Sequence, residues 1–354
     1  MRNNPFFKCE YKRSNFMKLK KNLTALCSGC AAGALLLITA PTYADTTLGL
    51  WEFEQNSGAI IDSYTPRKNG HLGRWDGEYS SENVNSFERD SGSGLFRDAI
   101  NFLGNRENQV VMIPDAVSPR FNPGMQSFKY EVRLKLRAWQ LAADGKMENQ
   151  QESWNVMQKG TWGQKGMWKM QIVPFSRSSS FFTSEQQDEI SEYSDWAQLA
   201  GFNDPVLMCV IQNQNASGEN SRANTIYAMS MVRLNAEATY RASCEIDRTN
   251  NELRAIVKYG NGTTPIRPNS SATVHVTDIS NQFGAINPGL DDTLECRAGE
   301  VAGFQGHNLS DMVSIGNKSY CPDTAADETD SAIVESDAFK GIVTEASIVR
   351  PDTW

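Results

Sequence analysis

Among the residues that could do chemistry, four cysteines in the C-terminal half of the chain form the most informative pattern. Cys209, Cys244, Cys296 and Cys321 are separated by 34, 51 and 24 residues, so none belongs to a Cys-x-x-Cys pair. Zinc sites normally contain closely spaced ligands, and the whole chain has only three histidines. If the chain is exported, as argued below, an even number of cysteines instead predicts two disulfides, which could pair in three ways.

The positions of these cysteines favour one pairing. Cys209 and Cys244 lie on the apolar faces of two alternating runs, 206–211 and 240–246, and alternation points both sulfurs toward packed surface. We therefore predict a Cys209–Cys244 disulfide. The remaining pair, Cys296 and Cys321, brackets the apolar run 312–316 and would hold the long loop that precedes it.

Two tryptophans flank a glycine-rich hairpin between the runs 154–159 and 167–173. If they are exposed, Trp162 and Trp168 could stack on a sugar ring, whereas tryptophans at such positions also serve as core residues. They are the candidate ligand-binding residues of the sequence, and both interpretations stay open at this point.

Acidic residues in loops are candidate calcium ligands, because hard carboxylate oxygens suit this cation. The candidates for a structural calcium are Asp62, Asp291 and Asp292, with Asp323 and Asp327 further along the chain. No run matches an EF-hand loop, and a generally acidic surface explains these residues equally well. No other cofactor is expected.

Catalytic groups are not evident in the sequence. Glycan hydrolysis needs two carboxylates about 5–10 Å apart, which alternating positions of one strand can supply. The acidic residues at 188–192 lie in an irregular polar segment and do not alternate, and we find no strand with carboxylates at alternating positions. The histidines at 71, 275 and 307 lack local companions for lyase chemistry. We therefore expect no catalytic residues.

The elements that must position these residues read as strands throughout. Phe128 begins the clearest one, with apolar residues at 128, 130, 132, 134 and 136 and charged residues between them, so one face should meet the core and the other water. The runs 99–104 and 109–114 are expected to pair around 105–108. The remaining expected strands are 48–53, 154–159, 167–173, 206–211, 226–231, 240–246, 253–259, 274–276, 312–316 and 339–349. Long loop insertions are expected near 73–95, 176–204, 281–306 and 322–337.

The order of these segments resembles the laminin G-like branch of the concanavalin A-like lectin/glucanase superfamily. The resemblance is carried by Leu-Trp-Glu-Phe at 50–53 with Ile-Asp-Ser at 61–63, by 100–104 with 110–114, and by 127–132, 156–160, 312–316 and 339–343. The chain departs from the family at 238–241, where Trp-His is common, so the strand framework transfers better than any site. The resemblance implies an all-β fold, a two-sheet antiparallel jelly-roll sandwich that binds ligands on its concave face or rim loops.

The N-terminal segment resembles an export signal. Lys18, Lys20 and Lys21 precede an apolar stretch at 23–38, and small residues before Ala44 fit cleavage there. We predict a signal peptide over residues 1–44, with Met17 as the start, followed by one domain over 45–354. Of the seven cysteines, three leave with this leader.

Removing the leader leaves 27 basic and 41 acidic residues, a net charge of −14. Such a surface repels nucleic acid and anionic membranes, so neither is an expected partner. We expect a secreted or periplasmic, non-catalytic binding module for carbohydrate or an extracellular protein. The alternatives are a glycan-active enzyme, either a polysaccharide lyase or a glycoside hydrolase, and a structural envelope or surface protein.

Overall fold

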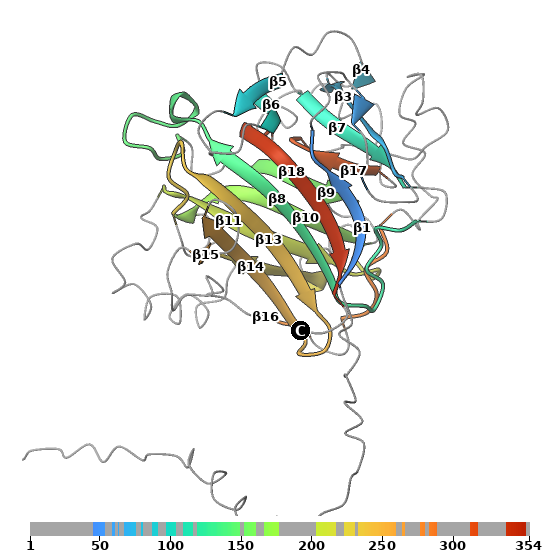
Figure 1. The fold of residues 1–354 in the computed structure, drawn as a ribbon. Helices are drawn as coiled ribbons and strands as arrows, with labels where there is room; N and C mark the ends of the chain where they lie inside the picture. Colours follow the sequence, from blue (N-terminus) through green and yellow to red (C-terminus); the bar gives the residue numbers. More distant parts are fainter. Residues whose placement is uncertain are drawn as a thin grey trace, which may run out of the picture. The chain divides into compact units, whose positions relative to one another are not determined.

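The chain folds into two antiparallel β-sheets that pack face to face (Figure 1). The structure is a computed structural model, and it describes residues 45–53, 59–60, 63, 67–75, 79–80, 87–90, 97–103, 109–115, 119–148, 152–160, 166–176, 203–216, 223–230, 233–259, 264–265, 277–279, 283–288, 312–317 and 338–351. These residues fall within one compact unit, 43–354. In this part of the chain, no helix has the length and hydropathy needed to cross a bilayer.

The first sheet, sheet A, is built around the longest strands. Its order is β15 (Thr264–Pro265), β14 (Glu252–Tyr259), β13 (Thr239–Asp247), β8 (Phe128–Leu136), β18 (Lys340–Arg350), β6 (Arg97–Leu103) and β5 (Phe87–Asp90). In addition, β1 (Thr46–Trp51) pairs with β18, and β16 (Thr277–Asp278) pairs with β14. Figure 1 shows β8, β13 and β18 side by side, as their registers require.

The second sheet, sheet B, lies behind sheet A in Figure 1. Its order is β12 (Thr225–Met229), β11 (Pro205–Gln212), β10 (Met167–Pro174), β9 (Trp154–Lys159), β17 (Met312–Ile315), β7 (Gln109–Pro114), β3 (Gly70–Trp75) and β2 (Ala59–Ile60), and β4 (Tyr79–Ser80) pairs with β3. A short 3-10 helix, η2 (Ala138–Gln140), follows β8. The fold is thus the expected two-sheet, antiparallel jelly-roll sandwich.

The core lies between the two sheets and follows from strand alternation. On β8 the apolar residues Phe128, Tyr130, Val132, Leu134 and Leu136 are buried in it, as predicted. The opposite face of β8 differs from the prediction. Its charged side chains are half-buried or buried rather than exposed to water, because acidic and basic groups on β8, β13 and β18 pair across the strands.

The structure differs from the sequence-based expectations at two places. The runs at 99–104 and 109–114 do not pair with each other, because β6 belongs to sheet A and β7 to sheet B, so the chain crosses between the layers there. The segment 73–95, predicted to be an insertion, contains the end of β3 together with β4 and β5. Hydrogen bonds to β7 and β6 make strands of this polar segment. Residues 177–202 and 322–337 of the other predicted insertions lie outside the described residues.

Candidate functional site

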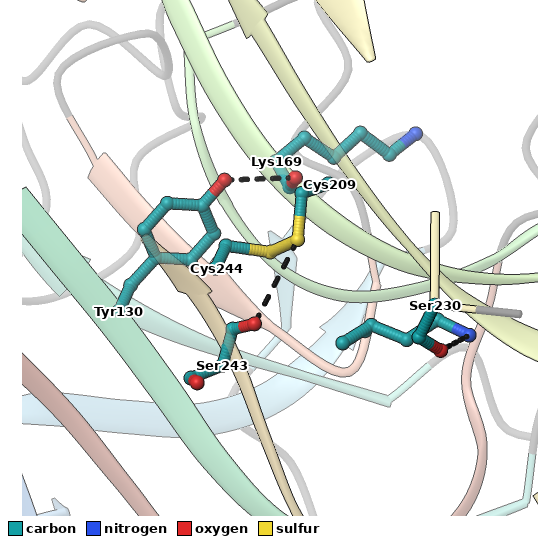
Figure 2. Close-up of a disulfide and its surroundings, with 7 residues drawn as sticks. Tyr130, Lys169, Cys209, Ser230, Ser243 and Cys244 are labelled. Atoms are coloured by element: carbon teal, nitrogen blue, oxygen red, sulfur yellow. Dashed lines mark hydrogen bonds between the residues drawn. A yellow bond between two sulfur atoms is a disulfide. The ribbon is translucent and has the colours of Figure 1, made fainter. Parts of the chain in front are cut away.

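One of the two predicted disulfides is present and joins the two sheets. Cys209 on β11 and Cys244 on β13 are bonded, with their Cα atoms 5.6 Å apart, and both are fully buried (Figure 2). Beside this bond the Tyr130 hydroxyl of sheet A donates to the Lys169 carbonyl of sheet B at 3.1 Å. Burial raises the pKa of Tyr130, so its proton is retained for this bond. Cys296 and Cys321 lie outside the described residues, so their pairing stays a prediction.

The stacking role considered for Trp168 is wrong. Its side chain is fully buried against Phe128 and Tyr130, and its indole nitrogen donates to the Phe121 carbonyl at 2.9 Å. Alternation along β10 turns it into the sandwich, which no sugar can reach. Trp162 lies outside the described residues.

The predicted calcium ligands are not tested by this structure. Asp62, Asp291 and Asp292 lie outside the described residues, as do Asp323 and Asp327. Within the described ranges, no three histidine, cysteine, aspartate or glutamate side chains come together as a metal site would require.

An open cavity of about 330 Å³ lies where three strands of sheet A end or begin. Since β8 runs antiparallel to β13 and β18, its first residues lie beside the last residues of both. The residues that line the cavity come from just before β8, from just after β13 and from the C-terminal end of β18: 125–127, Arg248, Thr249, Arg350 and Pro351. This volume falls in the range of small-molecule pockets.

Arg350 reaches the cavity because it ends the last strand. Ile348 lies in the core, and alternation places Arg350 two residues further on the same face, where the core stops. It is half-buried, and its Nε has no hydrogen-bond partner. The guanidinium therefore lies at the rim of the sandwich and lines the cavity.

Arg248 is held in place by three contacts. Its backbone N–H donates to Ser127 Oγ at 3.0 Å, its guanidinium donates to the Gly284 carbonyl at 2.8 Å, and its Cζ lies 5.8 Å from the ring centre of Phe283. Burial lowers the pKa of Arg248 below its ordinary value. An arginine still carries its charge at neutral pH in such surroundings.

The two guanidiniums have no acidic counterpart in the described part of the chain. No carboxylate there forms an ion pair with Arg248 or Arg350, and the Nε atoms of both are buried without an acceptor. Around them lie an amide at Gln126 and hydroxyls at Ser127 and Thr249. The cavity can therefore bind an anion and hydrogen-bond a polar ligand.

A second cluster of charged groups lies on the outer face of sheet A. The Lys129 ammonium is 2.9 Å from Glu131 and 3.5 Å from Glu245, which brings two carboxylates from β8 and β13 to one cation. Burial raises the pKa of Glu245 above its ordinary value, although Lys129, Arg254 and Lys258 act against this. Burial tends to lower the pKa of Lys129, but the two carboxylates outweigh it and the pKa is raised.

The expectation that no strand carries alternating carboxylates is wrong. Glu245 and Asp247 are two residues apart on β13, whose predicted end at residue 246 left Asp247 out. Asp247 is fully buried and has a structural role. It accepts the backbone N–H groups of Thr249 and Asn250 at 2.9 Å each and pairs with Arg254 at 3.0 Å, which fixes the turn after β13.

Sequence reasoning did not find Arg248 or Arg350. Each lies in an unremarkable local sequence, and they line one cavity only because β13 and β18 flank β8. Glu245 lies on a strand that the sequence predicts. Extending that predicted strand by one residue would have shown that Glu245 and Asp247 occupy alternating positions.

Comparison with known proteins finds similarity of structure but none of sequence. No protein-family model matches the sequence. A search of curated proteins also returns no match. The fold is similar to solved structures at very low sequence identity.

Botulinum neurotoxin binding domains are among these structures. One is of type C, described with cell entry dependent on interaction with two ganglioside molecules (TM-score 0.45, 7% identity, 86% of this chain and 48% of that one). Another is the type DC binding domain in complex with rat synaptotagmin II (TM-score 0.45, 8% identity, 86% and 48%). The chain thus spans about half the length of these toxin structures.

An endo-1,3-β-glucanase from Streptomyces sioyaensis also matches, at a TM-score of 0.35 and 12% identity, over 88% of this chain and 98% of that one. The similarity to all of these structures is one of β-sandwich fold, and we transfer no residue role from them.

Proposed function

We propose that this chain is a secreted binding module, laminin G-like within the jelly-roll sandwiches, whose ligand is a carbohydrate or an extracellular partner. The observation that carries the proposal is the rim cavity, in which Arg248 and Arg350 lie together with amide and hydroxyl groups and without an acidic residue. Clefts with a few convergent polar groups are the usual places for small ligands.

The groups in the cavity suit binding better than turnover. Guanidinium groups stay protonated at neutral pH, and a serine, a threonine or a glutamine without an adjacent base does not transfer protons efficiently. These groups can donate and accept several hydrogen bonds, which is what recognition of a sugar or a peptide requires.

Export of the chain is supported by two features. The N-terminal sequence has the order of basic, apolar and small residues that signal peptidase requires. The inter-sheet Cys209–Cys244 disulfide is of the kind that persists in oxidising compartments. N-terminal sequencing of the exported protein should begin at Asp45, and recovery of an uncleaved chain would contradict this part of the proposal.

The binding function is tested with the mature protein on a glycan array and in a pull-down with extracellular extracts, with calcium present. Binding that is weakened by Ser127→Ala or Arg350→Ala, with folding unchanged by circular dichroism, would support the cavity as the ligand site. Binding that both substitutions leave intact would locate the site elsewhere, and the absence of any ligand would contradict the function.

A second candidate function, glycan hydrolysis, is favoured by the Glu131–Lys129–Glu245 cluster. Two carboxylates reach one lysine, and the raised pKa of Glu245 is the property that a general acid needs. The test is to incubate the protein with a panel of polysaccharides and to measure new reducing ends. Release that Glu245→Gln abolishes would establish the enzyme, and no release by the wild type would remove this candidate.

A further inference from the structure

The rim cavity has the opposite charge to the rest of the chain. The full sequence carries a formal net charge of −8, yet the residues that line the cavity include two arginines and no acidic group. Two guanidinium groups that line one cavity attract an anion to it.

We infer that this cavity binds the carboxylate of an acidic sugar, an inference that rests on the proposed binding function and names its ligand class. The planar guanidinium fork of arginine matches a carboxylate, with two parallel N–H···O bonds available to each group. No acidic residue lines the cavity, so a ligand carboxylate would supply the anionic partner of Arg248 and Arg350.

The neighbouring groups suit the rest of a sugar ring. Ser127 Oγ accepts the Arg248 backbone N–H, which leaves its own hydroxyl hydrogen to donate to a ligand. Gln126 and the exposed Thr249 add amide and hydroxyl groups that can pair with sugar hydroxyls. Met125, which is 55% exposed at the same cavity, offers an apolar side chain to the C–H face of a ring.

The orientation of Arg248 is already fixed before any ligand binds. Its contacts with Ser127, Gly284 and Phe283 hold one of the two guanidiniums in place, so less side-chain entropy is lost on binding. Arg350 is not held by comparable contacts among the described residues. It is therefore the better residue to substitute, because its loss should change the ligand site more than the fold.

The experiment measures binding of the mature protein to uronic acid oligomers by isothermal titration calorimetry. Trisaccharides of galacturonate, glucuronate and mannuronate are compared with the same sugars as methyl esters, which keep the shape and lose the charge. A sulfated neutral trisaccharide forms a further arm. We expect at least one free acid to bind, and its ester to bind about tenfold or more weakly, as the loss of charge-assisted hydrogen bonds predicts.

Three variants then locate the site. Arg350→Gln should weaken binding of the free acid by about 10–100-fold, and Arg350→Lys, which keeps the charge but not the fork, by less. Arg137→Gln is the matched control, because it removes one half-buried arginine, paired with Glu237 at 3.3 Å, elsewhere in the molecule. This control should bind like the wild type.

Several results would overturn the inference. They are equal binding of acid and ester, unchanged binding by Arg350→Gln, binding of the sulfated sugar alone, or no binding of any uronate. Failure of the proposed binding function gives a different result from failure of the acidic-sugar inference. Binding of neutral sugars with no preference for the acid would keep the binding module and remove the acidic ligand, whereas a protein that binds nothing on the glycan array or in the pull-down fails both.

Discussion

The Lys159 ammonium lies 2.7 Å from Asp115 Oδ2, and both side chains are completely buried. Asp115 directly follows β7 and Lys159 is the last residue of β9. This ion pair therefore links the end of β9 to the segment that follows β7. Lys159 also donates to Asn122 Oδ1 at 2.6 Å, while Asp115 accepts the backbone N–H groups of Arg120 and Phe121 at 2.9 Å each. The pair thereby fixes a loop at the edge of the core.

Loss of the anion should cost more than loss of the cation. Asp115 is also 2.9 Å from Lys68, so Lys159→Met leaves the carboxylate with one counter-charge and two N–H donors. Asp115→Asn removes the carboxylate that both lysines contact. We expect the asparagine variant to lose about 3–5 kcal/mol in free energy of unfolding and the methionine variant less. Urea denaturation measures both, and the reverse order would show that Lys68 does not compensate.

The inter-sheet disulfide should stabilise the sandwich through the unfolded chain. The bond closes a loop with a sequence separation of 35, for which the chain-entropy model gives about 3–4 kcal/mol. We expect Cys209→Ala/Cys244→Ala to unfold at correspondingly lower denaturant than the oxidised wild type. Reduced wild type serves as the control, because its stability should approach that of the double variant. A difference under about 1 kcal/mol between the oxidised protein and the variant would contradict this account.

The second predicted disulfide can be tested without substitution. Digestion of the unreduced protein should yield a peptide that links Cys296 to Cys321, in addition to the one that links Cys209 to Cys244. Mass spectrometry before and after reduction identifies both. A free thiol at either position would show that the spacing argument fails.

Glu245 should make stability depend on pH in the acid range. Its pKa is raised in the folded protein, chiefly by burial, so the folded state holds this proton more tightly than the unfolded chain. Its contribution is therefore most favourable below the ordinary glutamate pKa of 4.5 and is lost as the pH rises through the folded pKa. The stability of the wild type relative to Glu245→Gln should fall from pH 4 toward neutrality, as denaturation at several pH values would measure. A constant or rising difference would contradict the raised pKa.

Much of the fold could be predicted because alternation is a local signal. The faces of β8, β11 and β13 could be read from the sequence, and with them the Cys209–Cys244 pair. The partners of β6 and β7 could not, because a short connection between two apolar runs is compatible both with a hairpin and with a crossover between sheets. The burial of the charged face of β8 could not be predicted either, because it depends on ion pairs between distant parts of the chain. Glu131 pairs with Arg241 of β13, which also pairs with Glu345 of β18.

The candidate site depends almost entirely on such long-range convergence. Arg248 and Arg350 become neighbours through the antiparallel registers of β8 with β13 and with β18, and nothing around either residue marks it as a ligand. Trp168, in contrast, was a chemically plausible candidate that the parity of β10 turns into the core. A tryptophan suggests sugar binding by its residue type. Only the knowledge of which face of β10 is buried excludes that role for Trp168.

Gly316 directly follows β17, at a position where no side chain fits. Its φ is +86°, and an added Cβ would lie 1.9 Å from the Phe102 ring, which is itself buried. Its N–H donates to the Val156 carbonyl at 3.0 Å and its carbonyl accepts the Phe339 N–H at 2.7 Å, so the backbone cannot easily move away. Gly316→Ala should therefore lose more stability than the roughly 1–2 kcal/mol that left-handed backbone costs a residue other than glycine. Gly124→Ala is the control, because its φ is +60° but its added Cβ would meet only Asn287 Oδ1 at 3.6 Å. We expect this control to lose only the stability that the left-handed backbone costs. Equal losses of unfolding free energy in the two variants would show that contact with Phe102 does not restrict position 316.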